Sequence, residues 1–272
     1  MKIALYLAAP GSRFWTAATP LSLEAALARA SALGYDAVEI MPTDFSDPDP
    51  ATVAATAARC GLEVLVIASG FLAVEHGLTF THPDAGVRRR AVEGVTRCVD
   101  IAVQVGAPFV SVGIVRGKLV DGASRAEAAA HLAACLREAA LYAGARGITL
   151  ALEPGNRYET DFVHTVREAL DLLAEVGLPS LRLLVDTFHM NIEEASIPDA
   201  VRLGAAHLVH VHFADSNRRA PGWGHLDFGA VARALREIGY AGAVGLEMSL
   251  APGFEAAAGQ GLRFVRALLP PR

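Results

Sequence analysis

Four residues of the kind that bind metal ions follow four apolar runs in the second half of the sequence. The runs are TLALEP, LRLLVDTFH, HLVHVHFAD and AVGLEM, and their polar residues are Glu153, Asp186, His212 and Glu247. Successive members of this strand-tip cluster lie 33, 26 and 35 residues apart, which leaves room for one strand–helix unit in each gap. On four successive strands of one barrel, such residues would converge on a single point.

Three carboxylates and one imidazole predict an oxygen-rich metal site. This donor set favours one divalent ion, with Mn²⁺ as the first choice and Mg²⁺ or Co²⁺ as alternatives, over structural zinc. Three anionic ligands also leave room for a chelating substrate. His210 lies two residues before His212 and therefore on the same face of its strand, where it either supports the ligand or, as we favour, fills the barrel interior.

The elements that must position these residues alternate regularly along the chain. Short apolar or β-branched runs predict strands at residues 2–7, 36–41, 63–69, 108–115, 149–153, 181–186, 207–213 and 243–248. Segments of helical period predict helices at residues 22–33, 51–60, 85–105, 124–146, 161–176, 197–203, 228–238 and 254–268. Eight such units favour an α/β fold, a single (β/α)8 TIM barrel spanning residues 1–272 as one domain. An open doubly wound sheet is the alternative, but no G-x-G-x-x-G follows the first predicted strand.

Composition excludes several other classes of protein. The chain has 272 residues, 53% of them hydrophobic, which suffices for one large core. No apolar run reaches the roughly 18 residues of a membrane span, and the opening KIALYLAA, interrupted at Pro10, favours a strand over a signal peptide. Cys60, Cys98 and Cys135 show no metal-type spacing and no even set for disulfides, which predicts a cytoplasmic protein. With a net charge of −5 and no dense basic stripe, we expect neither a nucleic-acid nor a membrane partner.

Several stretches of the chain resemble one known family. LALEPGNRYETDF, LVDTFHMNIEE, HVHFADSNRRAPGWGHLDFG and GLEM are similar to the D-tagatose 3-epimerase family of xylose-isomerase-like TIM barrels, and DTFHMNIEE is highly specific to it. The resemblance runs through essentially the whole chain. Within the family, NRYETDF, GLTFTHP, IVRGKL and ADSNRRAPG look closest to the members that epimerise 5-keto-L-gluconate.

The resemblance implies roles for individual residues. The strand-tip cluster corresponds to the metal ligands, and Glu153 and Glu247 correspond to the carboxylates that also move the proton at the epimerised carbon. Glu159, His189 and Arg218 correspond to substrate contacts near the reacting oxygens. The resemblance also implies a homodimer or homotetramer of whole barrels.

The chemistry of these residues suits a two-base epimerisation independently of the resemblance. A proton next to a ketone is too weakly acidic for an unaided carboxylate, and a divalent ion held by the ketone and the neighbouring hydroxyl stabilises the enediolate. Glu153 and Glu247 could then remove a proton from one face and return one to the other.

The predicted substrate contacts have alternative roles. His189 and Arg218 are donors suited to the developing oxyanion; otherwise His189 orders a loop and Arg218 forms a surface ion pair. Glu159 could bind a substrate hydroxyl, hold His189 in one tautomer, or cap the helix that follows.

Residues on the loops are candidates for the substrate walls. Arg116 follows the fourth predicted strand, and we expect a free cation at the barrel mouth that could bind the carboxylate of a keto-acid, a surface charge being the alternative. Trp15 and Phe71 could form the apolar wall of a sugar site or pack in the core. The longest predicted loops follow the third, sixth and seventh strands.

The leading prediction is a metal-dependent carbohydrate epimerase that acts on a free ketose or keto-aldonate, possibly 5-keto-L-gluconate. An aldose–ketose isomerase, such as a hydroxypyruvate isomerase, could use the same ligands for proton transfer between neighbouring carbons. An endonuclease IV-like DNA-repair nuclease is a remote alternative, because it needs more histidines at strand tips and a basic surface. A non-catalytic sugar-binding barrel is opposed by the matched glutamate pair.

Overall fold

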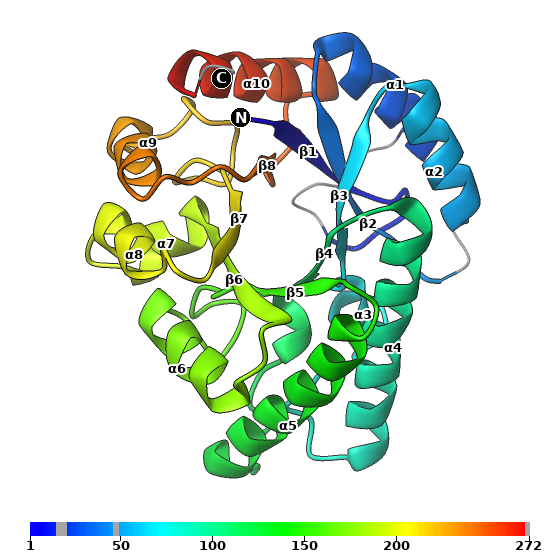
Figure 1. The fold of residues 1–272 in the computed structure, drawn as a ribbon, viewed down its shortest axis with the longest axis vertical. Helices are drawn as coiled ribbons and strands as arrows, with labels where there is room; N and C mark the ends of the chain where they lie inside the picture. The colour runs from blue at the N-terminus through cyan, green and yellow to red at the C-terminus, as the bar shows by residue number, and fades with distance from the viewer. Residues whose placement is uncertain (15–20, 46–48, 270–272) are drawn as a thin grey trace.

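Eight parallel strands form a closed barrel, and the helices surround it (Figure 1). The computed structural model describes residues 1–14, 21–45 and 49–269. The strands are β1 (Ile3–Ala8), β2 (Ala37–Met41), β3 (Glu63–Ala68), β4 (Phe109–Val112), β5 (Thr149–Leu152), β6 (Leu181–Asp186), β7 (Leu208–His212) and β8 (Val244–Leu246). Each strand pairs with the next and β8 pairs with β1, so the predicted (β/α)8 TIM barrel is confirmed.

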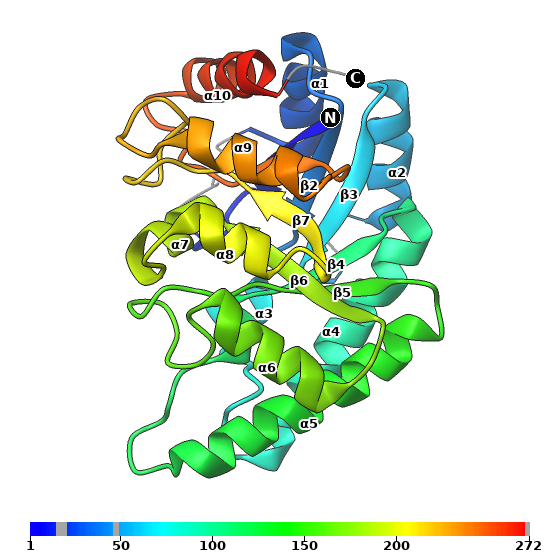
Figure 2. The ribbon, with the colours of Figure 1, turned by 60° about the vertical axis from the view of Figure 1, so that its left-hand side comes forward.

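Helices connect successive strands along the outside of the barrel, as the turned view also shows (Figure 2). They are α1 (Leu23–Leu33), α2 (Pro50–Arg59), α3 (Phe71–Val74), α4 (Ala85–Val105), η1 (Ile114–Arg116), α5 (Arg125–Gly144), α6 (Val166–Val176), α7 (Thr187–Glu193), α8 (Ile197–Leu203), α9 (Phe228–Glu237) and α10 (Phe254–Leu268). Local chemistry fixes their ends: Asp84 accepts from two backbone N–H groups at the start of α4, and Gly106 ends that helix in the left-handed conformation. Among the described residues, no helix is both long and apolar enough to cross a bilayer.

Several segments differ from the prediction made on periodicity: the strand expected at residues 108–115 ends at Val112, where η1 follows, and the short helix α3 lies in the loop expected after β3. The helix expected at residues 161–176 begins only at Val166, because Thr165 caps it and residues 161–163 are tied to neighbouring loops instead. The expected loop after β6 contains the short helix α7, whose first turn is capped by the side chain of Asp186. A helix of seven residues is too short for its period to stand out in the sequence.

The interior of the barrel changes from apolar to polar along the strands. Near the strand starts, small and apolar residues pack together, namely Ala4, Ala37, Leu65 and Val66, with Phe109 and Ala243 against them. Two residues further along, Tyr6 of β1 lies in register with Glu39 of β2, and both are buried. Polar side chains therefore begin halfway up the barrel and continue to its C-terminal end.

Candidate active site

The barrel gathers the strand-tip cluster at the C-terminal ends of its strands. Asp186 and His212 are the last residues of β6 and β7, and Glu153 and Glu247 follow β5 and β8 directly. One ligand atom from each of the four lies within 4.8 Å of the others, and all four side chains are buried. The sequence spacing thus correctly predicted which residues converge.

His212 stands at the centre of the cluster. Its Nδ1 lies 2.7 Å from Glu247 Oε2 and 3.3 Å from Glu153 Oε1, while its Nε2 lies 2.8 Å from Glu39 Oε2. The two ring nitrogens therefore face different carboxylates. Only Nδ1 faces the space that the strand-tip cluster surrounds.

Arg218 balances part of the negative charge. Its Nη1 donates to Asp186, and its Nη2 lies 2.8 Å from Glu247 Oε1. The residue is buried and has a φ of 61°, a left-handed conformation that is uncommon for a non-glycine residue and is often found at functional sites. Its backbone is held on both sides, because its N–H donates to Asp215 and its carbonyl accepts from Ser249.

The crowding of charge shifts the pKa values of the cluster in opposite directions. Burial raises the pKa of Asp186, and the charges of Glu247 and Glu153 add to the rise against the opposing effect of Arg218. Burial also acts to raise the pKa of Glu247, but Arg218 and His212 outweigh it and hold this pKa below its usual range. Burial would lower the pKa of His212, yet the carboxylates of Glu39 and Glu247 raise it well above its ordinary value.

A hydrogen-bonded group on the loop after β5 fixes the orientation of His189. The side-chain amide nitrogen of Asn156 lies 2.8 Å from His189 Nδ1 and 2.9 Å from Glu159 Oε1, while the amide oxygen accepts from the backbone N–H of Tyr158. Because the amide nitrogen can only donate, His189 Nδ1 accepts and its Nε2 carries the hydrogen. Burial, together with the positive charges of Arg218 and Arg116, lowers the pKa of His189, so this ring is neutral. Asn156 therefore holds the tautomer, a role considered for Glu159 from the sequence.

The expectation that Arg116 is a free cation at the barrel mouth is wrong. Its side chain is buried, with 1% of the residue exposed, and it donates to the carbonyls of Gly113, Phe162 and Val163. Burial lowers the pKa of Arg116 to about 10, which leaves it charged at neutral pH. The guanidinium thus holds the loop after β5 against the loop after β4, because its acceptors come from both loops.

A pocket opens at this end of the barrel, and the proposed proton-transfer and substrate residues line it together. Its walls are formed by Tyr6, Phe14, Met41, Ala68, Gly70, Ser111, Gly113, Ile114, Glu153, Glu159, His189, Arg218 and Glu247. Tyr6 and Phe14 contribute an aromatic side, with ring centroids 6.1 Å apart. Phe71, for which a wall position and core packing were the two expectations, is fully buried in the core, and Trp15 lies outside the described residues.

Two residues that contact the site, Glu39 and Asn156, escaped the sequence reasoning for different reasons. Glu39 is a charged residue inside the apolar strand AVEIM, and that contrast alone could have marked it as a candidate. Asn156 gave no such signal, since an asparagine after Pro and Gly is ordinary in a turn. Its function follows only from the position of His189, 33 residues further along the chain.

A second cavity lies at the opposite end of the barrel, near the strand starts. Its lining includes Lys2, Asp36 and Arg266 together with apolar residues. Lys2 pairs with Glu63, and Arg266 pairs with Asp36, so these charges are already matched. The candidate metal ligands, and the pocket that two of them line, lie at the other end of the barrel.

Comparisons with known proteins agree on one family. A sequence model described as xylose isomerase-like TIM barrel matches residues 27–268. The chain is 33% identical over 236 residues to an L-ribulose 3-epimerase of Mesorhizobium japonicum, covering 84% of this chain and 76% of that protein. It is 34% identical over 216 residues to a ketose 3-epimerase of Arthrobacter globiformis, covering 79% and 73%. The crystal structure of a D-allulose 3-epimerase from Methylomonas sp. superimposes with a TM-score of 0.82 at 26% identity, covering 99% of this chain and 98% of that one.

The buried position of Arg116 generates a prediction that differs from a substrate contact. Arg116→Ala removes a buried guanidinium and its hydrogen bonds to three loop carbonyls, so we expect a loss of about 2–4 kcal/mol in the free energy of unfolding, measured with urea. Turnover of neutral ketoses and of keto-acids should fall by the same factor, because the loop as a whole is loosened. Arg125→Ala is the control, since Arg125 is exposed and donates to Asp161 of the same loop. A rise in KM confined to keto-acids would place Arg116 on the substrate instead.

Proposed function

The chain belongs to the xylose isomerase-like TIM-barrel family, and from this premise we propose that it is a divalent-metal-dependent epimerase of a free ketose or keto-aldonate. It is a carbohydrate isomerase, since relatives that share about a third of its sequence over most of its length are named L-ribulose 3-epimerase and ketose 3-epimerase. One observation carries the proposed mechanism. The carboxylates of Glu153 and Glu247, from non-adjacent strands, reach the same imidazole nitrogen of His212 inside one pocket.

The strand-tip cluster fits a divalent cation. Three buried carboxylates face one guanidinium and one imidazole, and burial together with the charges of Glu247 and Glu153 raises the pKa of Asp186. Oxygen donors with a single imidazole suit Mn²⁺, which we propose, with Mg²⁺ and Co²⁺ as alternatives. When bound, such an ion would polarise the ketone oxygen of the substrate as a Lewis acid.

Glu153 and Glu247 are proposed to exchange the proton at the reacting carbon. Inversion of a carbon centre requires that a base remove the proton from one face while an acid returns a proton to the other. Arg218 and His212 keep Glu247 ionised, which suits it to accept the proton in one direction of the reaction. Glu153 would then return a proton, and the two residues would exchange these tasks in the reverse direction.

Arg218, His189 and Glu159 are proposed to orient the substrate oxygens. His189 presents its Nε2–H on the side away from Asn156, and a neutral imidazole can donate this hydrogen to a developing oxyanion without giving it up. Glu159 lines the same pocket as an acceptor for a substrate hydroxyl. Arg218 fixes the carboxylates of Asp186 and Glu247 from the same side.

The pocket supports an uncharged ketose ahead of a keto-aldonate or a sugar phosphate. Among the lining residues that the structure describes, Arg218 is the only arginine or lysine, and its guanidinium is already paired with two carboxylates. A substrate carboxylate such as that of 5-keto-L-gluconate would find no unpaired cation there. We further propose a cytoplasmic location, as the pattern of the cysteines indicates, and a homodimer or homotetramer, as the resemblance to the family implies.

Removal of the metal tests the proposed cofactor. Dialysis against EDTA is expected to abolish turnover, and Mn²⁺ should restore it. Mn²⁺ at 100 times its Kd should also add about 2.7 kcal/mol to the free energy of unfolding, visible as a rise in Tm. Asp186→Asn should lose this rise, whereas Asp199→Asn, on the exposed side of α8, should keep it. Full turnover after complete removal of metal would contradict the proposal.

Glu247→Gln tests the pair of bases, because the substitution keeps the shape of the side chain but removes its proton acceptor. With saturating Mn²⁺, epimerisation should fall by about 10³-fold or more. In deuterated water, the variant should still exchange the substrate proton of one epimer through Glu153, and Glu153→Gln should exchange that of the other epimer. NMR of the recovered sugar gives both rates. Exchange of both epimers in each variant would refute separate bases on the two faces.

A substrate panel tests the substrate class and the type of reaction. Neutral ketoses, among them D-psicose and L-ribulose, should be turned over with a higher kcat/KM than 5-keto-acids. The product formed in deuterated water should carry one deuteron at an inverted carbon. Formation of an aldose would instead identify an aldose–ketose isomerase. Faster turnover of 5-keto-acids would overturn the preference for an uncharged substrate while leaving the metal and the two glutamates in place.

A further inference from the structure

We propose that Glu39 is a positioning residue that holds His212 in the tautomer required for metal binding, and that His210 in turn holds Glu39. The inference rests on the proposed metal centre and adds two residues to its machinery. Neither Glu39 nor His210 lines the pocket, so neither can contact the substrate directly. Their effect must pass through His212.

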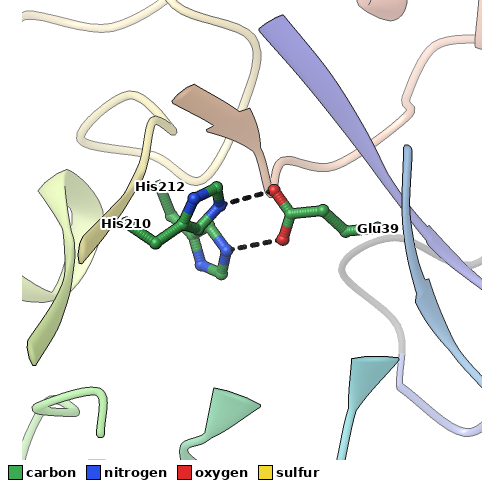
Figure 3. A group of neighbouring side chains, drawn as sticks. All are labelled: Glu39, His210 and His212. Atoms are coloured by element: carbon green, nitrogen blue, oxygen red, sulfur yellow. Dashed lines mark hydrogen bonds and ion pairs between the residues drawn. The ribbon is translucent and has the colours of Figure 1, made fainter. Parts of the chain in front are cut away.

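The three side chains form a continuous chain of contacts across the barrel interior. Glu39 points from β2 toward β7, where both imidazole rings turn to meet it (Figure 3). Glu39 Oε1 lies 2.7 Å from His210 Nε2, and Glu39 Oε2 lies 2.8 Å from His212 Nε2. All three side chains are at most 1% exposed, so water does not compete for these contacts.

The chemistry of a carboxylate fixes which nitrogen of each ring carries a hydrogen. An ionised carboxylate only accepts hydrogen bonds, so both Nε2 atoms must donate. His212 Nδ1 is the nitrogen that faces Glu153 and Glu247, and on metal binding it is the one that would lose its hydrogen and offer its lone pair. A ligating imidazole whose other nitrogen donates to a carboxylate is oriented and made more basic, and loss of that carboxylate typically weakens metal binding.

His210 has no other polar partner among the described residues. Its Nδ1 is buried and makes no hydrogen bond, while its ring packs 6.0 Å from the Phe109 ring and 5.2 Å from the His212 ring. Glu39 is therefore the one hydrogen-bond partner of the His210 side chain among the described residues. A second donor on Glu39 stops the carboxylate from rotating away from His212, because each oxygen is bound to a different ring.

The neighbouring strand leaves room for this arrangement. Gly245 of β8 pairs in register with His212, and a Cβ built on Gly245 would lie 1.8 Å from Glu39 Oε1. Any side chain at this position would thus displace the carboxylate. The glycine at position 245 is an observation separate from the hydrogen bonds, and it too fits a Glu39 carboxylate held against His212.

The test measures Mn²⁺ affinity, by electron paramagnetic resonance of the free ion, and the Tm of the metal-free protein. Glu39→Gln has a single acceptor oxygen for two donors, so we expect its Kd for Mn²⁺ to rise about 10- to 100-fold. Tyr240→Phe is the matched control. It removes a buried hydroxyl whose single hydrogen lies between the carbonyls of Ala243, just before β8, and Val209 in β7, and its Kd should stay within about twofold of the parent.

A second pair of variants decides the question if Glu39→Gln does not fold. His210→Gln can still donate to Glu39 and should retain Mn²⁺ affinity, whereas His210→Phe cannot donate and should bind Mn²⁺ at least about fivefold more weakly.

Equal affinities for these two variants, or an unchanged Kd in folded Glu39→Gln, would overturn the proposal. Two Mn²⁺ ions per parent chain that fall to one in Glu39→Gln would also overturn it, since Glu39 would then be a ligand of a second ion. No Mn²⁺ binding by the parent protein would refute the proposed metal centre itself.

Discussion

Four carboxylates buried within one half of a barrel impose the constraint on which the rest of the site depends. Glu39, Glu153, Asp186 and Glu247 are each less than a tenth exposed, and removing an ionised carboxylate from water costs several kcal/mol unless it is paired. The structure matches them with His210, His212 and Arg218, which all lie within hydrogen-bonding reach of at least one carboxylate. The arrangement is a charge network with an excess of negative charge at its centre, and a divalent cation is the natural complement of that excess.

The closed barrel carries most of this network on its strands. The cluster residues sit at or one residue beyond strand ends, where backbone pairing on both sides fixes the direction of each side chain. The glutamates can therefore approach the same nitrogen of His212 from separate strands, which brings the two proposed bases into one site. The same closure brings β2 opposite β7, so that a carboxylate on one can bind both imidazoles on the other.

The loops add a second kind of support through buried polar groups that never reach the pocket. Arg116 gathers carbonyls from the loops after β4 and β5, and Asp215 accepts backbone N–H groups from Ser216, Gly222 and Leu226 in the loop after β7. A buried charge used in this way orders several loop residues at once, because each hydrogen bond to a charged group is stronger than a neutral one. Arg218 thereby reaches the pocket from a loop that Asp215 orders, while His189 reaches it from helix α7.

The sequence by itself determined the alternation of strands and helices and the four residues at the strand tips. Both follow from local properties, since periodicity marks each element and the C-terminal ends of parallel strands always meet on one side of a barrel. Only the tertiary structure decided that Glu39 contacts residues 171 and 173 positions away, because a contact across the interior depends on barrel closure and register. Only the structure, likewise, showed that Arg116, expected as a free cation at the barrel mouth, is buried and binds loop carbonyls. The direction of a loop side chain depends on the acceptors that other loops bring to it, and the sequence does not show these. Asn156 belongs with these two, for its hydrogen bond to His189 exists only once the ends of β5 and β6 lie side by side.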